Sequence, residues 1–221
     1  VLLRQGFTGT ELLLFGAVLS PDGTRAAQDY DIIVVLKGPT QSIIVREKQK
    51  VAGIWINVDS AQLRSAPAYY AVASTRPVDQ IVDDKTAAIY ELGLEWLQLS
   101  PIGSIDAAEQ ARFAAGLVAL NTEHGLYRQD QGGVKVSEQV LYQARIGLPS
   151  RVPTGTYTAE TFAVSKGRVV ASASATVEVR KIGIERAIAT FADQYGLFYG
   201  LLTVAVSVGM GWLAGRLFAL I

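Results

Sequence analysis

The sequence predicts a mainly β protein, in which an immunoglobulin-like β-sandwich with a helical-hairpin insert is followed by one C-terminal transmembrane helix. Short apolar or alternating segments separated by turn residues indicate strands in both halves of the chain. An Ala-, Leu- and Glu-rich middle indicates helices between them, and the last segment lacks charge. These observations divide the chain into a sandwich domain at 1–180 with an insert at about 83–122, a juxtamembrane segment at 181–194 and a transmembrane helix at 195–217.

Five segments in the first part of the chain are predicted strands. DIIVVLK (31–37) is apolar on both faces, which is typical of a central strand. SIIVREK (42–48) turns from apolar to charged, as expected of a strand that reaches the edge of a sheet. In GIWINV (53–58), aliphatic residues alternate with tryptophan and asparagine. The other two strands are TELLLFGAVL (10–19) and YYAVAS (69–74).

The middle of the chain is predicted to hold two helices. KTAAIYELGLEWLQL (85–99) and SIDAAEQARFAAGLVAL (104–120) are rich in helix-forming residues, and Ser104 with Asp106 provides a start for the second. Alanine dominates the second segment, so neither helix buries enough apolar surface to fold alone. We therefore expect an insert within one sandwich and no separate domain.

After Gly132-Gly133 the pattern returns to strands. Residues 140–146 alternate, and two further strands are predicted on either side of Lys166-Gly167. In the last strand, one face carries Val169, Ala171, Ala173, Ala175, Val177 and Val179, and the other is polar. This alternation predicts an antiparallel sheet with one buried face. The P-x-G-x-Y run in VPTGTY (152–157) occurs often in immunoglobulin-like domains.

The C-terminal segment YGLFYGLLTVAVSVGMGWLAG (195–215) carries no charged side chain. A helix of this length spans about 31 Å, which matches the hydrocarbon core of a bilayer. A buried helix of a soluble protein usually has a polar face, and this segment has none. Residues placed for the membrane interface are Tyr195, Tyr199, Trp212 and Arg216.

Small residues recur every three or four positions in this helix and fall within an arc of roughly 120°. They are Gly196, Gly200, Thr203, Ser207, Gly211 and Gly215. Small residues let a second membrane helix approach closely, so this arc is a predicted packing face. The alternative is that glycine is simply frequent in membrane helices.

The composition disfavours most catalytic chemistry. Lys plus Arg and Asp plus Glu number 20 each, which gives no overall attraction to nucleic acid. The chain has no cysteine and a single histidine, His124, so thiolate sites and histidine-based metal sites or triads are disfavoured. Asp83-Asp84 is better explained as a helix cap than as a metal site. We expect no enzymatic activity, no cofactor and no metal.

One small-anion site is conceivable. An arginine among hydroxyl groups can hold an oxyanion, and Arg76 lies near Tyr69 and Tyr70 in the sequence. The alternative explanation is a strand end that runs into a turn.

Several stretches together resemble a family of transmembrane proteins from alphaproteobacteria that has no established function. The stretches are GFTGTELLLFGA (6–17), VAGIWINV (51–58), YYAVASTRP (69–77), GLY (125–127), VPTGTY (152–157), VRKIGIER (179–186) and YGLLTVAVSVGMGWLAG (199–215). The resemblance implies a signal peptide, a periplasmic domain and one C-terminal anchor. It also implies genes often placed near sulfite-exporter-like permeases, and it brings no catalytic residues.

Two observations bear on the orientation, and they favour opposite sides of the membrane. The basic residues Arg180, Lys181 and Arg186 would by themselves favour a cytoplasmic domain. The chain begins at Val1 and not at methionine, which a removed signal peptide would explain, and the resemblance agrees with a periplasmic domain. We expect an inner-membrane accessory subunit with a cytoplasmic C-terminus, whose partners are the bilayer and another integral membrane protein such as a permease or an energy-converting complex. The alternative is a tethered periplasmic module that binds a small anion such as sulfite.

Overall fold

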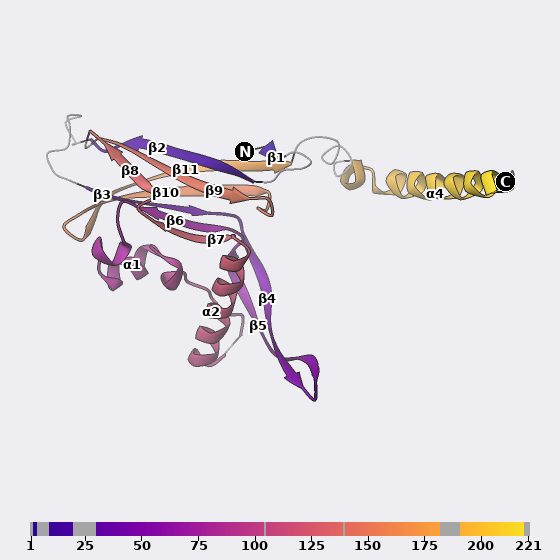
Figure 1. Cartoon of the computed structure of the whole chain (residues 1–221), viewed down its shortest axis with the longest axis horizontal. Coiled ribbons are helices and arrows are strands. Elements are labelled where there is room, and N and C mark those ends of the chain that lie inside the picture. The colour runs from indigo at the N-terminus through magenta and orange to yellow at the C-terminus, as the bar shows by residue number, and fades with distance from the viewer. Residues whose placement is uncertain are drawn as a thin grey trace. The chain divides into compact units, whose positions relative to one another are not determined.

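The computed structural model describes residues 2–3, 9–19, 30–103, 105–138, 140–181 and 191–218. The chain forms two compact units, one within Thr8–Val179 and a second that contains Arg180–Ile221 (Figure 1). Each unit is described by itself. Most of the juxtamembrane segment predicted at 181–194 lies outside the described residues.

A six-stranded mixed sheet has its centre in the first unit. Its order is β1 (Leu2–Leu3), β11 (Arg168–Lys181), β10 (Gly155–Ser165), β3 (Asp31–Lys37), β6 (Tyr70–Ser74) and β7 (Tyr127–Gln131). β1 and the residues Arg180 and Lys181 with which it pairs belong to the second unit. β3 pairs antiparallel with both of its neighbours, and β6 pairs in parallel with β7. The predicted central strand is confirmed: residues 32–36 of β3 are all buried, because both faces of the sheet are covered at this strand.

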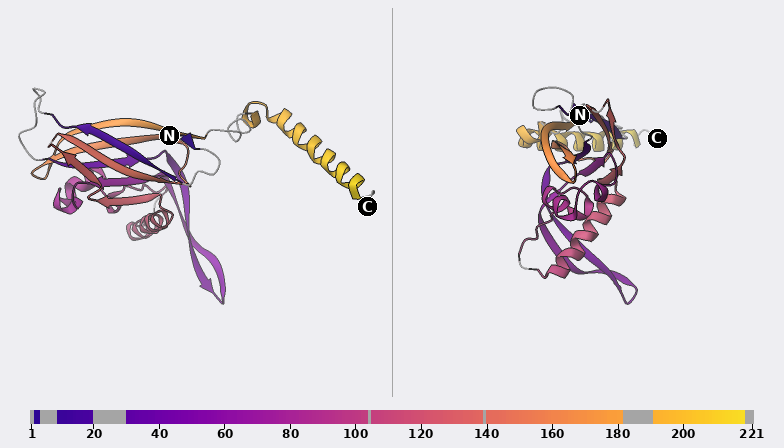
Figure 2. Two further views of the ribbon diagram at one scale, coloured as in Figure 1. Left: turned by 45° about the horizontal axis from the view of Figure 1, so that its top comes forward. Right: turned by 90° about the vertical axis from the view of Figure 1, so that its left-hand side faces the viewer.

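A three-stranded sheet packs on one face of the larger sheet, so the predicted β-sandwich is confirmed (Figure 2). It consists of β2 (Gly9–Ala17), β9 (Leu141–Pro149) and β8 (Val134–Ser137). Tyr69 joins the two layers by donating its hydroxyl hydrogen to the Gly147 carbonyl at 2.9 Å. The parallel β6–β7 pair departs from the all-antiparallel sheets of immunoglobulin domains, and the immunoglobulin-like topology is not confirmed.

The insert connects β6 to β7 and covers the opposite face of the six-stranded sheet (Figure 1). Parallel neighbours need such a long crossover. The insert comprises η1 (Val78–Gln80), α1 (Asp84–Tyr90), η2 (Leu94–Trp96) and α2 (Ala107–Glu123). Its side chains Val78, Ile81 and Leu92 share one buried core with Ile33 and Phe162 of the sheet.

The two helices of the insert differ from each other in length. The helix predicted over 104–120 is confirmed as α2. It starts after Asp106, whose carboxylate accepts a hydrogen bond from the Ala108 amide at 3.2 Å. The helix predicted over 85–99 is wrong beyond Tyr90. Glu91 takes a left-handed conformation with φ 52°, and Gly93 follows at φ 142°, so the chain leaves the helix there.

A long two-stranded ribbon, called the arm below, joins β3 to β6. It consists of β4 (Thr40–Val51) and β5 (Ile54–Pro67) and projects from the sandwich in Figure 2. Its base packs on the insert through a second small core of Leu63, Ala66, Leu99 and Leu117. Farther out, Arg112 of α2 contacts Glu47 at 3.0 Å and Asp59 at 2.7 Å, one residue on each strand.

The prediction that one face of β11 is buried is wrong for the middle of this strand. Ala171, Ala173 and Ala175 of β11 are exposed, like the polar residues between them. The three-stranded sheet contacts the six-stranded sheet at β3 and β6, and Tyr142 of β9 donates its hydroxyl hydrogen to Thr161 of β10 at 3.3 Å. The middle of β11 stays uncovered by the described residues.

The second unit contains α4 (Gly196–Phe218), which confirms the transmembrane helix predicted at 195–217. Its apolar span runs from Gly196 to Arg216, 21 residues. All the side chains of this span are exposed except that Gly209 is half-buried. Such a helix without polar neighbours is suited to a lipid environment.

Candidate functional site

The small-residue face of α4 is open and has no unsatisfied hydroxyl group. Thr203 donates its hydroxyl hydrogen to the Tyr199 carbonyl at 2.8 Å, and Ser207 donates to the Thr203 carbonyl at 2.9 Å. Apart from the neighbouring backbone of the helix itself, a Cβ atom added at any glycine of the face, Gly196, Gly200, Gly211 or Gly215, would meet no heavy atom within 4 Å. Because both hydroxyls are turned back onto the helix, the face presents mainly backbone and small apolar atoms to a neighbour.

Aromatic residues gather near both ends of α4, as membrane-interface residues do. Phe191 lies 5.5 Å from the Tyr195 ring and 6.5 Å from the Tyr199 ring, measured between ring centroids. At the other end, the Arg216 guanidinium lies 5.9 Å from the Trp212 ring centroid. The sequence reading missed Phe191. Its spacing of four residues before Tyr195 is the signal that would have found it.

The three residues of the conceivable anion site do not come together. Tyr69 and Tyr70 lie at the start of β6, and Arg76 lies past its end, about 20 Å away at the rise of an extended strand. Both tyrosine side chains are fully buried. They donate their hydroxyl hydrogens to the carbonyls of Gly147 and Glu91 respectively. Burial raises the pKa of both phenols above the ordinary value, so both remain neutral.

Arg76 already has an anionic partner. Its Nε donates to Asp31 Oδ1 at 2.9 Å and its Nη2 to Asp31 Oδ2 at 2.6 Å, a two-point contact. Thr75 also donates to Asp31, at 2.9 Å. Hydrogen bonding from Arg76 holds the pKa of the Asp31 carboxyl below its usual value, so the pair stays charged at neutral pH. A free anion would have to displace this carboxylate.

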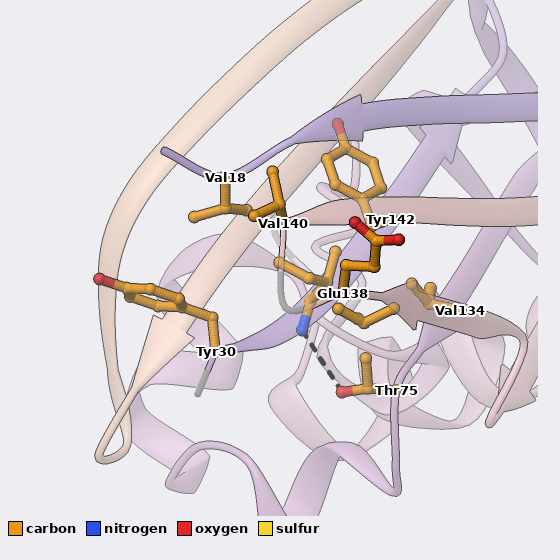
Figure 3. A pocket seen from close by; sticks show the side chains of 9 residues that line it. Val18, Tyr30, Thr75, Val134, Glu138, Val140 and Tyr142 are labelled. Carbon is orange, nitrogen blue, oxygen red and sulfur yellow. Dashed lines mark hydrogen bonds between the residues drawn. The ribbon is translucent and has the colours of Figure 1, made fainter. Parts of the chain in front are cut away.

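A cleft of about 470 Å³ lies at the end of the sandwich where β6 finishes (Figure 3). Thr75 accepts a hydrogen bond from the Ile32 amide at its floor, at 3.3 Å. The lining residues are Val18, Tyr30, Ile32, Thr75, Val134, Val136, Glu138, Val140 and Tyr142. The lining combines aliphatic side chains with the hydroxyl groups of Tyr30, Thr75 and Tyr142 and the carboxylate of Glu138. The carboxylate disfavours an anionic ligand.

The other candidate residues have structural roles. Asp83 Oδ1 accepts a hydrogen bond from the Thr86 amide at 2.8 Å and caps α1, as expected. His124 is the C-terminal cap residue of α2, and its amide donates to the Leu120 carbonyl at 3.0 Å. In the described part of the chain, no group of three His, Cys, Asp or Glu side chains is placed to hold a metal ion.

The outer part of the arm is a surface feature that the sequence reading did not recognise. Every residue from 48 to 58 is exposed, including Ile54 at 68% and Trp55 at 66%. The segment predicted as the strand GIWINV is a strand, but no other element covers it within the described chain. The signal was present: VAGIWINV (51–58) is a run of uncharged, mostly apolar residues directly after Lys48 and Lys50.

Comparison with known proteins identifies the family. Residues 1–219 match the family described as "Putative transmembrane protein (Alph_Pro_TM)". The chain belongs to this family. The match includes the sandwich, the arm and the membrane helix, and it confirms the resemblance seen in the sequence. The neighbourhood with permease genes stays a prediction. No curated protein and no solved structure matches the chain.

Proposed function

We propose that the protein is a non-enzymatic, single-pass accessory subunit of an inner-membrane complex or transporter. The observation that carries the proposal is the small-residue face of α4. Its hydroxyls are satisfied within the helix, and nothing in the described chain covers it. Glycine lowers helix propensity by about 1 kcal/mol relative to alanine, so Gly200, Gly211 and Gly215 are understandable if another membrane helix packs there.

The test replaces two small residues of this face by leucine in the full chain. Ser207→Leu with Gly211→Leu should leave membrane insertion intact, because leucine is at least as apolar. The added side chains should separate the helices, and a loss of about 1.4 kcal/mol already weakens association tenfold. We expect about tenfold less co-purifying membrane protein when the tagged variant is extracted from its native membrane in mild detergent.

The chain provides a matched control on the opposite side of α4. Ala205 and Gly209 are also small residues four positions apart, but they lie about 160° around the helix from Ser207 and Gly211. Ala205→Leu with Gly209→Leu should keep the partner. If the first pair of substitutions also keeps every co-purifying protein, the face is ordinary lipid-facing surface. Equal loss with both pairs would contradict a contact specific to one face.

We further infer that the sandwich lies in the periplasm and that the C-terminus is cytoplasmic. The family resemblance supports this orientation, whereas Arg180 and Lys181 beside the helix would by themselves favour the opposite one. A reporter fused after Ile221 should behave as cytoplasmic. Protease added to spheroplasts should digest the region 1–180, and protection of that region would overturn the orientation.

The alternative, a tethered module that binds an anion such as sulfite, has no comparable support. Asp31 already binds the Arg76 guanidinium, and the nearby cleft carries the carboxylate of Glu138.

A further inference from the structure

The arm has a supported base and an unsupported tip. Arg112 clamps both strands at Glu47 and Asp59, and the cores of the protein end there. The tip comprises residues 48–58, all exposed, with a two-residue turn at Ala52 and Gly53. Both turn residues have positive φ, 49° and 88°, as the tight turns of β-hairpins require. An isolated two-stranded ribbon is only marginally stable in water, so this tip is suited to a second surface.

The pairing register shows how side chains are distributed on the tip. Val51 pairs with Ile54 at the end of the ribbon, and Lys50 pairs with Trp55 one position behind. Directly paired residues share a face, and successive pairs alternate. The aliphatic side chains of Val51 and Ile54 therefore lie on one face at the end of the ribbon, and those of Trp55 and Lys50 lie on the other face. Lys48 lies on the lysine face, opposite Asn57.

The charges of the tip have one sign. Lys48 and Lys50 are its only charged residues, and residues 51–58 carry none. The nearest carboxylates, Glu47 and Asp59, are already paired with Arg112. The tip therefore presents two positive charges behind an uncharged leading end, and its charge complements an anionic surface.

We propose that the tip of the arm enters the headgroup layer of an anionic lipid bilayer, end-on. This would be a second membrane contact in addition to α4. On each strand, two residues lie between the Lys50–Trp55 pair and the end of the ribbon. At the rise of a strand, these residues extend about 7 Å beyond Lys50. That depth matches the boundary between headgroups and acyl chains, where water still solvates the unpaired backbone groups of the ribbon edges. Trp55 and Lys50 stand at one level behind this leading end, where tryptophan favours the membrane interface and the long lysine side chain reaches the anionic headgroups.

The chain itself supplies the reason to choose lipid over a protein partner. It belongs to a transmembrane family and carries a helix that could cross a bilayer, so the unit that bears the arm is tethered to a membrane through the same chain. The contact is independent of the helix packing proposed above. Loss of a protein partner from α4 would leave it unchanged, and its failure would leave that packing unaffected.

Tryptophan fluorescence tests the proposal in the full chain. A Trp212→Phe background removes the anchor signal and leaves Trp55 and Trp96, neither of which belongs to the membrane helix. The protein is reconstituted in vesicles of phosphatidylcholine and phosphatidylglycerol, with or without bromine near the headgroup end of the acyl chains. We expect brominated lipid to quench emission strongly. The quenching should disappear when Trp55→Phe is added, because Trp96 packs against the insert core.

Changing the charge of the tip provides a second test. Each lysine near an anionic surface strengthens binding about fivefold. Lys48→Glu with Lys50→Glu should therefore reduce quenching of Trp55 while α4 still holds the protein in the vesicle. Phosphatidylcholine alone should also quench less. If brominated and ordinary vesicles give the same Trp55 emission, the proposal is wrong. It is equally wrong if Trp55 becomes shielded only when a co-purified protein is present.

Discussion

Replacing Tyr70 by alanine should lower the free energy of unfolding of the sandwich by about 3–5 kcal/mol, the usual range for a large buried aromatic side chain. Tyr70 is fully buried at the start of β6, and its ring meets the Tyr127 ring edge-on at a centroid distance of 6.1 Å. Its hydroxyl donates to the Glu91 carbonyl and accepts from the Gly93 amide at 3.2 Å. The side chain therefore joins the sheet to the insert at the point where α1 ends.

The measurement is urea unfolding of the full chain in mild detergent, followed by Trp96 fluorescence in a background lacking Trp55 and Trp212. Tyr70→Phe keeps the ring but leaves Glu91 and Gly93 without their partner, so it should cost about 1–3 kcal/mol. Tyr90→Ala is the exposed control. It loses one ring contact with Phe162, at 5.3 Å, and should cost about 1 kcal/mol. Similar losses for Tyr70→Ala and Tyr90→Ala would contradict the central role of Tyr70.

Replacing Leu63 by alanine should cost about 2–5 kcal/mol, because it empties the middle of the core beneath the arm. Leu63 is fully buried and packs with Leu99 and Leu117. The backbone is also joined at this point, since the Arg64 amide donates to the Ser100 carbonyl at 2.9 Å and the Ile102 amide to the Gln62 carbonyl at 2.7 Å. The side chain and these bonds together hold the arm against the insert.

Hydrogen exchange separates this effect from a uniform loss of stability. In the Leu63→Ala variant, protection should fall most in β4, β5 and the segment around residues 99–102, and less in β3 and β10. Val58→Ala lies farther out on the same strand, where the side chain is 44% exposed, and should change unfolding by no more than about 0.5 kcal/mol. If both variants behave alike, the arm is not held by this core.

The small core beneath the arm anchors its base to the insert. Its base is part of the folded domain, whereas its tip has no structural task within the described chain. A rigid base and an uncovered end are expected of a surface contact. Variants at the base should therefore change stability, and variants at the tip should change only what the arm touches.

Several elements were predictable because local physics decides them. The run of apolar residues in DIIVVLK (31–37) requires cover on both faces, and β3 is indeed covered on both faces. Asp106 caps α2 through its own carboxylate, a bond within one turn of helix. The uncharged length of 195–215 makes a helix that is long and apolar enough to cross a membrane, and this property is local to the segment. In these cases neighbouring residues supply the reason.

Other features depend on contacts between distant segments. The alternation in β11 predicted one buried face, but Ala171 and Ala173 on that face are exposed, because burial depends on which other elements cover the strand. The parallel pairing of β6 and β7 could not be read from either strand. The helix predicted over 85–99 stops early because Tyr70, from the sheet, binds the chain at Glu91 and Gly93.

The candidate sites divide in the same way. The sequence by itself predicted the apolar C-terminal helix and the arrangement of its small and aromatic residues, because helical periodicity and hydropathy are local properties. The packing and interface roles of these residues stay predictions. Only the tertiary structure decided the fate of Arg76, whose partner Asp31 lies 45 positions away. It also decided that VAGIWINV forms an exposed tip and not a core strand. Hydrophobicity shows that a side chain favours burial, but only the arrangement of the other elements determines whether the fold covers it.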